Sequence, residues 1–187
     1  MISAKAQSAF DRFVVELRFC NPELTSLDDL DTEILACAVW TDVRPLHGVA
    51  GLCDWRLAGG VSTLLRTAFV TGKPGEVVMV PGKPRLTFDK LLFFGAGPRN
   101  EFGEESFRRT VRHMLEVMEG LAARVAVVEL PGRPDELIAA ERAADILLAS
   151  AGRKREHDVW TLVEGPDGRK RITQHMIEER RRVRRVI

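Results

Sequence analysis

The apolar residues of this chain fall into short runs separated by turns that contain glycine or proline, a pattern typical of β-strands. Residues 34–40 are apolar almost throughout. Such a continuous run indicates a strand buried on both faces of a largely parallel sheet. Further apolar or alternating runs predict strands at residues 13–19, 76–80, 90–94 and 124–130.

Helical periodicity appears between these strands. The clearest helix is predicted at residues 103–122, where apolar side chains recur every three or four positions. An alanine-rich helix is predicted at residues 135–150, and residues 48–69 suggest one or two short helices broken near Gly59 and Gly60. Strands that alternate with helices predict an α/β layer fold.

The end of the chain has a different character. Residues 158–173 resemble a hairpin with its turn at residues 165–168, and residues 174–187 are predicted to form a basic amphipathic helix. Residues 153–187 hold 11 Lys and Arg against 6 Asp and Glu. The tail therefore carries an excess of about five positive charges and the rest of the chain about four negative ones, which favours an acidic partner for the tail.

Composition places the chain among ordinary globular proteins, with 45% hydrophobic and 29% charged residues. Its 187 residues fit one domain with a substantial core. The apolar runs are too short to span a membrane, and the first ten residues lack a signal-peptide hydrophobic region, so we expect a cytoplasmic protein. Cys20, Cys37 and Cys53 lack the spacing of a zinc site or a disulfide framework, which predicts reduced, buried thiols.

Three segments resemble the N-terminal domain of leucine aminopeptidases: RPLHGVAGLCDWRL at residues 44–57, GKPGE at residues 72–76, and LLFFGAG at residues 91–97, followed by a long helix. That domain is a relative of macro domains. The resemblance therefore implies an α/β, three-layer macro-like fold, in which a mixed, mostly parallel sheet carries helices on both faces. It assigns this domain to residues 1–173 and leaves residues 174–187 as a basic helix or linker.

Macro domains bind ADP-ribose, and the resemblance extends to their binding segments. Residues 23–25 resemble the Asp-Ile-Thr that holds adenine, and residues 41–45 stand where macro domains carry an asparagine-rich turn. Two glycine segments resemble the phosphate loops of the family. The ligand-binding residues implied in this way are Glu23, Asp42, Gly48, Val49, Ala50, Gly51, Gly95, Ala96 and Gly97.

Departures from the family pattern weigh against catalysis. Trp40 to Val43 replace the asparagines that de-ADP-ribosylating macro domains use, and Glu23 replaces their adenine-binding aspartate. In leucine aminopeptidases the N-terminal domain leads through a linker helix into a two-metal peptidase domain. The chain reaches Ile187 where that linker would stand, so we expect no peptidase activity, no bound metal and no cofactor.

The candidate site residues also have structural explanations. Glycine-rich segments between a strand and a helix can cradle phosphate with backbone N–H groups, but they can equally serve tight turns. Asp42, His47 and Asp54 would support acid–base chemistry only if they converge, and such residues more often cap helices or stay solvated. His113 is predicted to face solvent from the long helix.

The leading hypothesis is a non-catalytic macro-like module that works by binding a protein partner or a second copy of itself. One alternative is an ADP-ribose or nucleotide binder with weak ADP-ribosyl hydrolase activity. Another is a nucleic-acid binder, because clustered arginines can contact phosphates. The residues expected to contact a partner or nucleic acid are Arg180, Arg181, Arg182, Arg184 and Arg185.

Overall fold

The computed structural model describes residues 16–151 and 158–186. This part of the chain contains a six-stranded sheet in the order β1-β6-β5-β2-β4-β3. The strands are β1 (Glu16–Cys20), β2 (Ile34–Trp40), β3 (Val77–Pro81), β4 (Lys90–Gly97), β5 (Val125–Val128) and β6 (Val159–Val163). Strand β3 pairs with β4 in the antiparallel sense, whereas the other pairs are parallel. The predicted mixed, mostly parallel sheet is confirmed.

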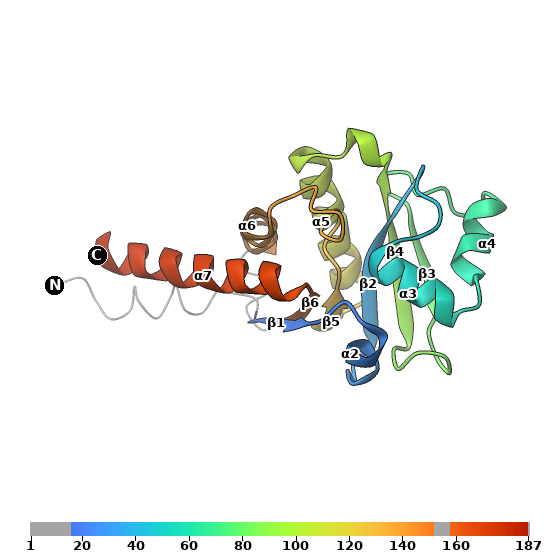
Figure 1. The fold of residues 1–187 in the computed structure, drawn as a ribbon, viewed down its shortest axis with the longest axis horizontal. Coiled ribbons are helices and arrows are strands. Elements are labelled where there is room, and N and C mark those ends of the chain that lie inside the picture. The colour runs from blue at the N-terminus through green and yellow to red at the C-terminus, as the bar shows by residue number, and fades with distance from the viewer. Residues whose placement is uncertain (1–15, 152–157, 187) are drawn as a thin grey trace.

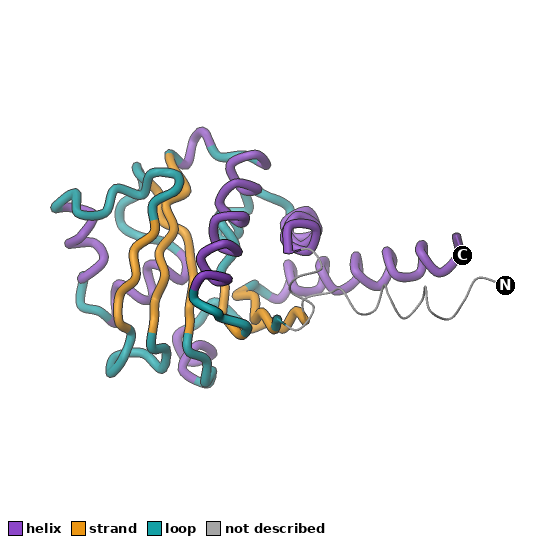
Figure 2. Tube along the Cα trace, turned by 180° about the vertical axis from the view of Figure 1, so that it is seen from behind, coloured by secondary structure: helices purple, strands orange, loops and turns teal. Residues whose placement is uncertain are grey.

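Helices cover both faces of this sheet, as Figure 1 and the reverse view in Figure 2 show. One face packs against α5 (Glu104–Gly120) and α6 (Ala140–Ala151), and the other against α2 (Leu24–Asp28), α3 (Gly48–Arg56) and α4 (Gly60–Arg66). A short 3-10 helix, η1 (Arg99–Glu101), precedes α5. The predicted three-layer arrangement is therefore confirmed.

The apolar periodicity of α5 explains how it packs. Phe107, Val111 and Met114 are fully buried and join Phe94 of β4 in the core on that face. Each such side chain stabilises the fold by roughly 1.5–3 kcal/mol when it is fully covered. The helix predicted at residues 103–122 is confirmed, and so is the predicted break near Gly59, which separates α3 from α4 with φ of 78°.

Two predictions for the second half of the chain are wrong. The helix expected from residue 135 begins only at Ala140, because the chain turns at Pro131 to Ala139 and Glu136 adopts φ of 52°. The expected hairpin after β6 is instead the start of α7 (Pro166–Val186). Pro166 occupies the first helical position, where its fixed φ and missing N–H are tolerated, so the glycine and proline residues there begin a helix.

Among the described residues, it is the first part of α7 that packs on the body. Ile172 is fully buried against Ala140 and Ala144 of α6, and Met176 packs beside them. Beyond these contacts α7 projects away from the sheet (Figure 1). Within the described residues, no helix is both long and apolar enough to cross a bilayer.

Candidate functional site

A cavity of about 480 Å³ opens at the carboxyl ends of parallel strands, where ligands of open α/β sheets commonly bind. Strand β5 leads into Glu129, β6 leads into Glu164, and Gly48 begins α3 beside them. We name this cavity the acidic cleft. The described residues that line it are Pro22, His47, Gly48, Glu129, Arg133, Pro134, Asp135, Glu136, Val163, Glu164 and Gly165.

Glu129 is a buried acid in the acidic cleft, and 5% of it is exposed. Its Oε1 accepts the N–H of Val49 at 2.9 Å, in the first turn of α3, where a helix offers unpaired donors to anions. Burial raises the pKa of Glu129 to about 8; the Val49 hydrogen bond opposes this rise, and the charges of Glu164 and Asp135 add to it. The chain thus supplies its own acid to this helix end.

Arg133 also lines the acidic cleft. Its Nε and Nη2 donate to the two carboxylate oxygens of Glu164 at 2.8 and 3.0 Å, and Nη1 donates to the carbonyl of Ile138. The Arg133 and Glu164 side chains are 3% and 9% exposed. Because this guanidinium is already paired with a buried carboxylate, it offers little net attraction to an anionic ligand.

Asp135 also lines the acidic cleft, and its side chain is 18% exposed. Its Oδ2 accepts the Nε of Arg99 at 3.0 Å, and its Oδ1 lies 3.9 Å from Nδ1 of His47. Asp42 accepts the backbone N–H of Arg99 at 2.9 Å. Arg99 therefore connects the segment after β2 with the segment after β5, and Asp42 has a structural contact there.

The first predicted glycine segment borders the acidic cleft through Gly48 alone. A Cβ on Gly48 would lie 2.6 Å from Glu129 Oε1 and 2.7 Å from Pro134 Cγ, and its φ is +57°. Val49 gives its N–H to Glu129, Ala50 is buried, and Gly51 donates its N–H to His47. Gly48 therefore lacks a side chain because Glu129 and Pro134 pack against it.

The second predicted glycine segment is not a loop. Gly95, Ala96 and Gly97 form the end of β4, outside the lining of the acidic cleft. The N–H groups of Gly95 and Gly97 donate to the carbonyls of Glu76 and Gly72 at 2.8 and 2.9 Å. A Cβ on Gly95 would lie 2.0 Å from the carbonyl oxygen of Lys73. Close backbone approach explains this glycine, so Gly95→Val would disturb the fold rather than leave it intact.

Other predicted residues lie in structural positions. Glu23 precedes α2 as an exposed N-cap, next to Pro22 of the acidic cleft. Asp54 accepts the backbone N–H of Ser62 at 2.9 Å and so caps the first turn of α4. His113, expected to face solvent, is half-buried with its ring 5.6 Å from that of Phe94. Asp42, His47 and Asp54 have separate partners rather than one shared site.

The acids of the cleft were missed by the sequence interpretation. Glu129 is the next-to-last residue of the strand predicted at residues 124–130, and Glu164 directly precedes the turn predicted at residues 165–168. A carboxyl group at the carboxyl end of an otherwise apolar parallel strand is the signal that could have found both, because such ends meet at one edge of the sheet. Arg133 follows Pro131 and Gly132 and carries no such signal.

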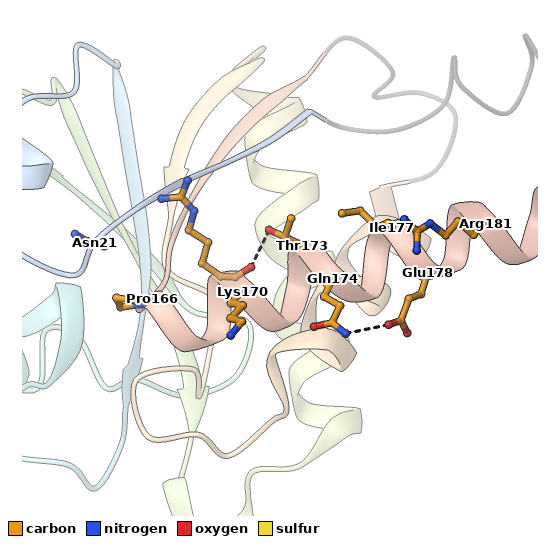
Figure 3. A pocket seen from close by; sticks show the side chains of 9 residues that line it. Asn21, Pro166, Lys170, Thr173, Gln174, Ile177, Glu178 and Arg181 are labelled. Carbon is orange, nitrogen blue, oxygen red and sulfur yellow. Dashed lines mark hydrogen bonds between the residues drawn. The ribbon is translucent and has the colours of Figure 1, made fainter.

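A second cavity, of about 640 Å³, runs along one side of α7 (Figure 3). Lys170, Gln174 and Glu178 project from successive turns there, and Gln174 donates to Glu178 at 3.1 Å. Of the predicted contact arginines, Arg181 lines this groove and Arg182 pairs with Glu179 at 2.6 Å. The side chains of Arg180, Arg184 and Arg185 lie outside the described residues.

The described part of the chain contains neither a cluster of metal-ligating side chains nor a disulfide bond. No group of three or more His, Cys, Asp and Glu side chains gathers there as a metal site. The three cysteines are free, with Cys37 and Cys53 buried and Cys20 half-buried. Burial raises the pKa of Cys53 to about 12, so this thiol stays protonated at neutral pH.

A family model described as the cytosol aminopeptidase family, N-terminal domain, matches residues 40–153. A probable cytosol aminopeptidase of Pseudomonas fluorescens (strain Pf0-1) is 31% identical over 117 residues, which are 63% of this chain and 23% of that protein. The cytosol aminopeptidase of Pseudomonas aeruginosa PAO1 is 29% identical over 55% of this chain and 21% of its own length. The chain thus spans less than a quarter of these curated relatives.

Solved structures share the fold at low sequence identity. A tomato leucine aminopeptidase mutant superposes with a TM-score of 0.58 and 14% identity, covering 87% of this chain and 35% of that one. A Trypanosoma brucei macrodomain in complex with ADP superposes with a TM-score of 0.64 and 17% identity, covering 86% and 69%. The same organism's macrodomain in complex with ADP-ribose gives 0.61 and 19%, covering 86% and 68%. The macro-like fold is therefore shown.

Proposed function

Because this chain belongs to the family of cytosol aminopeptidase N-terminal domains, we propose that it is a cytoplasmic, non-catalytic binding module. The observation that carries this proposal is how the polar groups of the acidic cleft are engaged. Glu129, Arg133 and Asp135 each hold another segment of the chain in place. The described lining contains no Ser, Thr or Cys nucleophile. Such a cleft suits binding without transformation of the ligand.

ADP-ribose or another nucleotide is the alternative ligand, supported by the fold shared with macrodomains that are in complex with ADP or ADP-ribose. A pyrophosphate needs unpaired N–H donors or cations around it. In the acidic cleft the N–H of Val49 goes to Glu129, and Arg133 is paired with Glu164. We therefore expect ADP-ribose to bind weakly and to leave the site unhydrolysed.

Association with a protein partner, or with a second copy of this chain, is proposed for the outer part of α7. Arg181 and Arg182 are exposed on this projecting helix, and exposed arginines attract acidic surfaces. Nucleic acid is the alternative partner of the same surface. Residues 174–187 lack the aromatic side chains on which single-strand binders stack bases, which favours a protein partner.

The proposed function is tested by titrating ADP-ribose and AMP into the full chain by isothermal calorimetry. In parallel, an ADP-ribosylated protein is incubated with the chain and the released ADP-ribose is measured. We expect weak nucleotide binding and no release above the uncatalysed rate. Turnover that persists after repurification, and that is lost in Glu129→Gln, would contradict a non-catalytic module.

A further inference from the structure

We propose that the acidic cleft binds a cationic group, an ammonium or guanidinium carried by a small ligand, through the carboxyl groups of Glu129 and Asp135. The inference rests on the proposed function, because it gives a ligand class to the cleft of the binding module. The cleft's volume of about 480 Å³ leaves room for a small organic cation.

The charges that line the acidic cleft determine whether it favours a cationic or an anionic ligand. Four carboxyl side chains face two basic ones in the described lining: Glu129, Asp135, Glu136 and Glu164 against His47 and Arg133. Arg133 and Glu164 form a buried bidentate pair and so neutralise each other. Asp135 shares its charge with Arg99, which is 42% exposed, and with His47 at 3.9 Å. Glu136 lies 3.7 Å from Arg171. Every lining carboxyl group other than Glu129 therefore has a basic partner, and the remaining balance is negative when Glu129 is ionised.

Glu129 supplies a second and independent observation. It is 5% exposed and lines the cavity, yet only Oε1 has a partner, the N–H of Val49. Oε2 has no hydrogen-bond partner in the described part of the chain. Oε2 is not among the fully buried polar atoms that lack a partner, so it is accessible from the acidic cleft and open to a hydrogen-bond donor. Ammonium and guanidinium groups consist only of donors and carry the complementary charge.

The packing around Glu129 fixes its position. Gly48 and Pro134 lie against its carboxyl group, so that a Cβ on Gly48 would be 2.6 and 2.7 Å from the two carboxyl oxygens. The Val49 hydrogen bond holds Oε1 on α3. Such a constrained acceptor loses little conformational entropy when a ligand binds.

The inference predicts a specific pH dependence. Burial raises the pKa of Glu129 to about 8, so a cation that needs the ionised form must displace a proton near neutral pH. The affinity for the cation should then rise about tenfold between pH 7 and pH 9, because Glu129 loses its proton over this range and the cation no longer has to displace it. The charged or titratable groups that face Glu129 from neighbouring elements are His47, Arg133, Asp135, Glu136, Glu164, Cys37 and Cys53.

The experiment titrates agmatine, which carries both cationic groups, into the full chain by isothermal calorimetry at pH 7, 8 and 9 and constant ionic strength. Uncharged 1,5-pentanediol and anionic ADP-ribose are titrated alongside. Glu129→Gln keeps an acceptor for Val49 but removes the charge, and Asp135→Asn is the second variant. Glu116→Gln, an exposed residue of α5, is the matched control. Circular dichroism checks that each variant is folded.

We expect saturable agmatine binding that strengthens about tenfold from pH 7 to pH 9 in the wild type and in Glu116→Gln. Both cleft variants should weaken it, and Glu129→Gln should remove most of the pH dependence. Absent agmatine binding, equal binding of pentanediol, or affinity unchanged in Glu129→Gln would each overturn the inference. ADP-ribose binding that improves in Glu129→Gln without any agmatine binding would also overturn it, yet would leave a binding module in place.

Discussion

The acidic cleft and the outer part of α7 are both built from charged side chains, but those side chains have opposite surroundings. In the acidic cleft Arg133 and Glu164 are 3% and 9% exposed, and both nitrogens of the guanidinium fork contact the carboxylate. On α7 Arg182 and Glu179 form a pair of 2.6 Å with 72% and 45% exposure. The two pairs have similar distances but contribute very differently to the stability of the fold.

Burial explains why the two pairs contribute differently to folding stability. An exposed ion pair is solvated whether or not it forms, so it contributes little to folding. A buried pair that loses one partner leaves an uncompensated charge in the interior, which costs far more. The acidic cleft is therefore held by its charges, whereas the outer part of α7 keeps its charges available for other molecules. The predictions below test this difference.

The largest expected effect comes from removing one arginine from each region. Arg133→Ala should lower the free energy of unfolding by about 3–5 kcal/mol, because it leaves Glu164 buried without a partner. Arg182→Ala removes the same type of side chain from the exposed pair and should change stability by less than about 1 kcal/mol. Urea denaturation of both variants measures this, and equal losses would show that burial does not separate the regions.

A somewhat smaller effect is expected from pH. The folded state holds Glu129 with a pKa of about 8, above the ordinary glutamate value of 4.5, so the folded chain binds more protons than the unfolded chain between those pH values. Protonated Glu129 therefore stabilises the folded state at low pH. The free energy of unfolding should fall as pH rises, by roughly 3 kcal/mol between pH 5 and pH 8.

Glu129→Gln removes this titration and should flatten that part of the stability curve, whereas Glu116→Gln on exposed α5 should keep the wild-type slope. Denaturation at several pH values, with the difference between the two variants as the readout, isolates the contribution of Glu129. Parallel curves for both variants would mean that Glu129 is ionised in the folded chain at neutral pH.

Much of the fold follows from local sequence patterns. The continuous apolar run at residues 34–40 became β2 with the same bounds, because only a central parallel strand buries both faces. The helical periodicity of apolar residues at 103–122 was likewise enough to predict α5. The prediction of a hairpin was wrong because Gly165 and Pro166 favour a turn and a helix start alike. The choice between them depended on Ile172 packing against α6.

The candidate site depended on contacts that no local pattern contains. Gly48 and Gly95 gave the same sequence signal, but one lies against Glu129 and the other against the backbone of Lys73. The pairing of Arg133 with Glu164 spans 31 residues, and that of Val49 with Glu129 spans 80. The carboxyl ends of β5 and β6 border the acidic cleft, but the charge of this cleft depends on these long-range pairs, which no local pattern contains.

The smallest expected effect on stability comes from shortening α7, and it separates the part of the helix that packs from the part that projects. Deleting residues 177–187 leaves Ile172 and Met176 in their contacts with α6. This deletion should therefore change the free energy of unfolding by less than about 1 kcal/mol, as for other exposed surface changes. Deleting residues 174–187 also removes Met176 and the 2.9 Å contact of His175 with Asp145, which should cost about 1–2 kcal/mol more.

Both deletions should reduce association in the same way, because each removes Arg181 and Arg182. Light scattering after size-exclusion chromatography, at low and high salt, measures this. We expect the full chain to associate more at low salt, since exposed charges are screened beyond a Debye length of about 8 Å at physiological ionic strength. Loss of association only in the longer deletion would assign it to the packed part of α7, and identical masses for all three chains would leave the projecting arginines without a role in self-association.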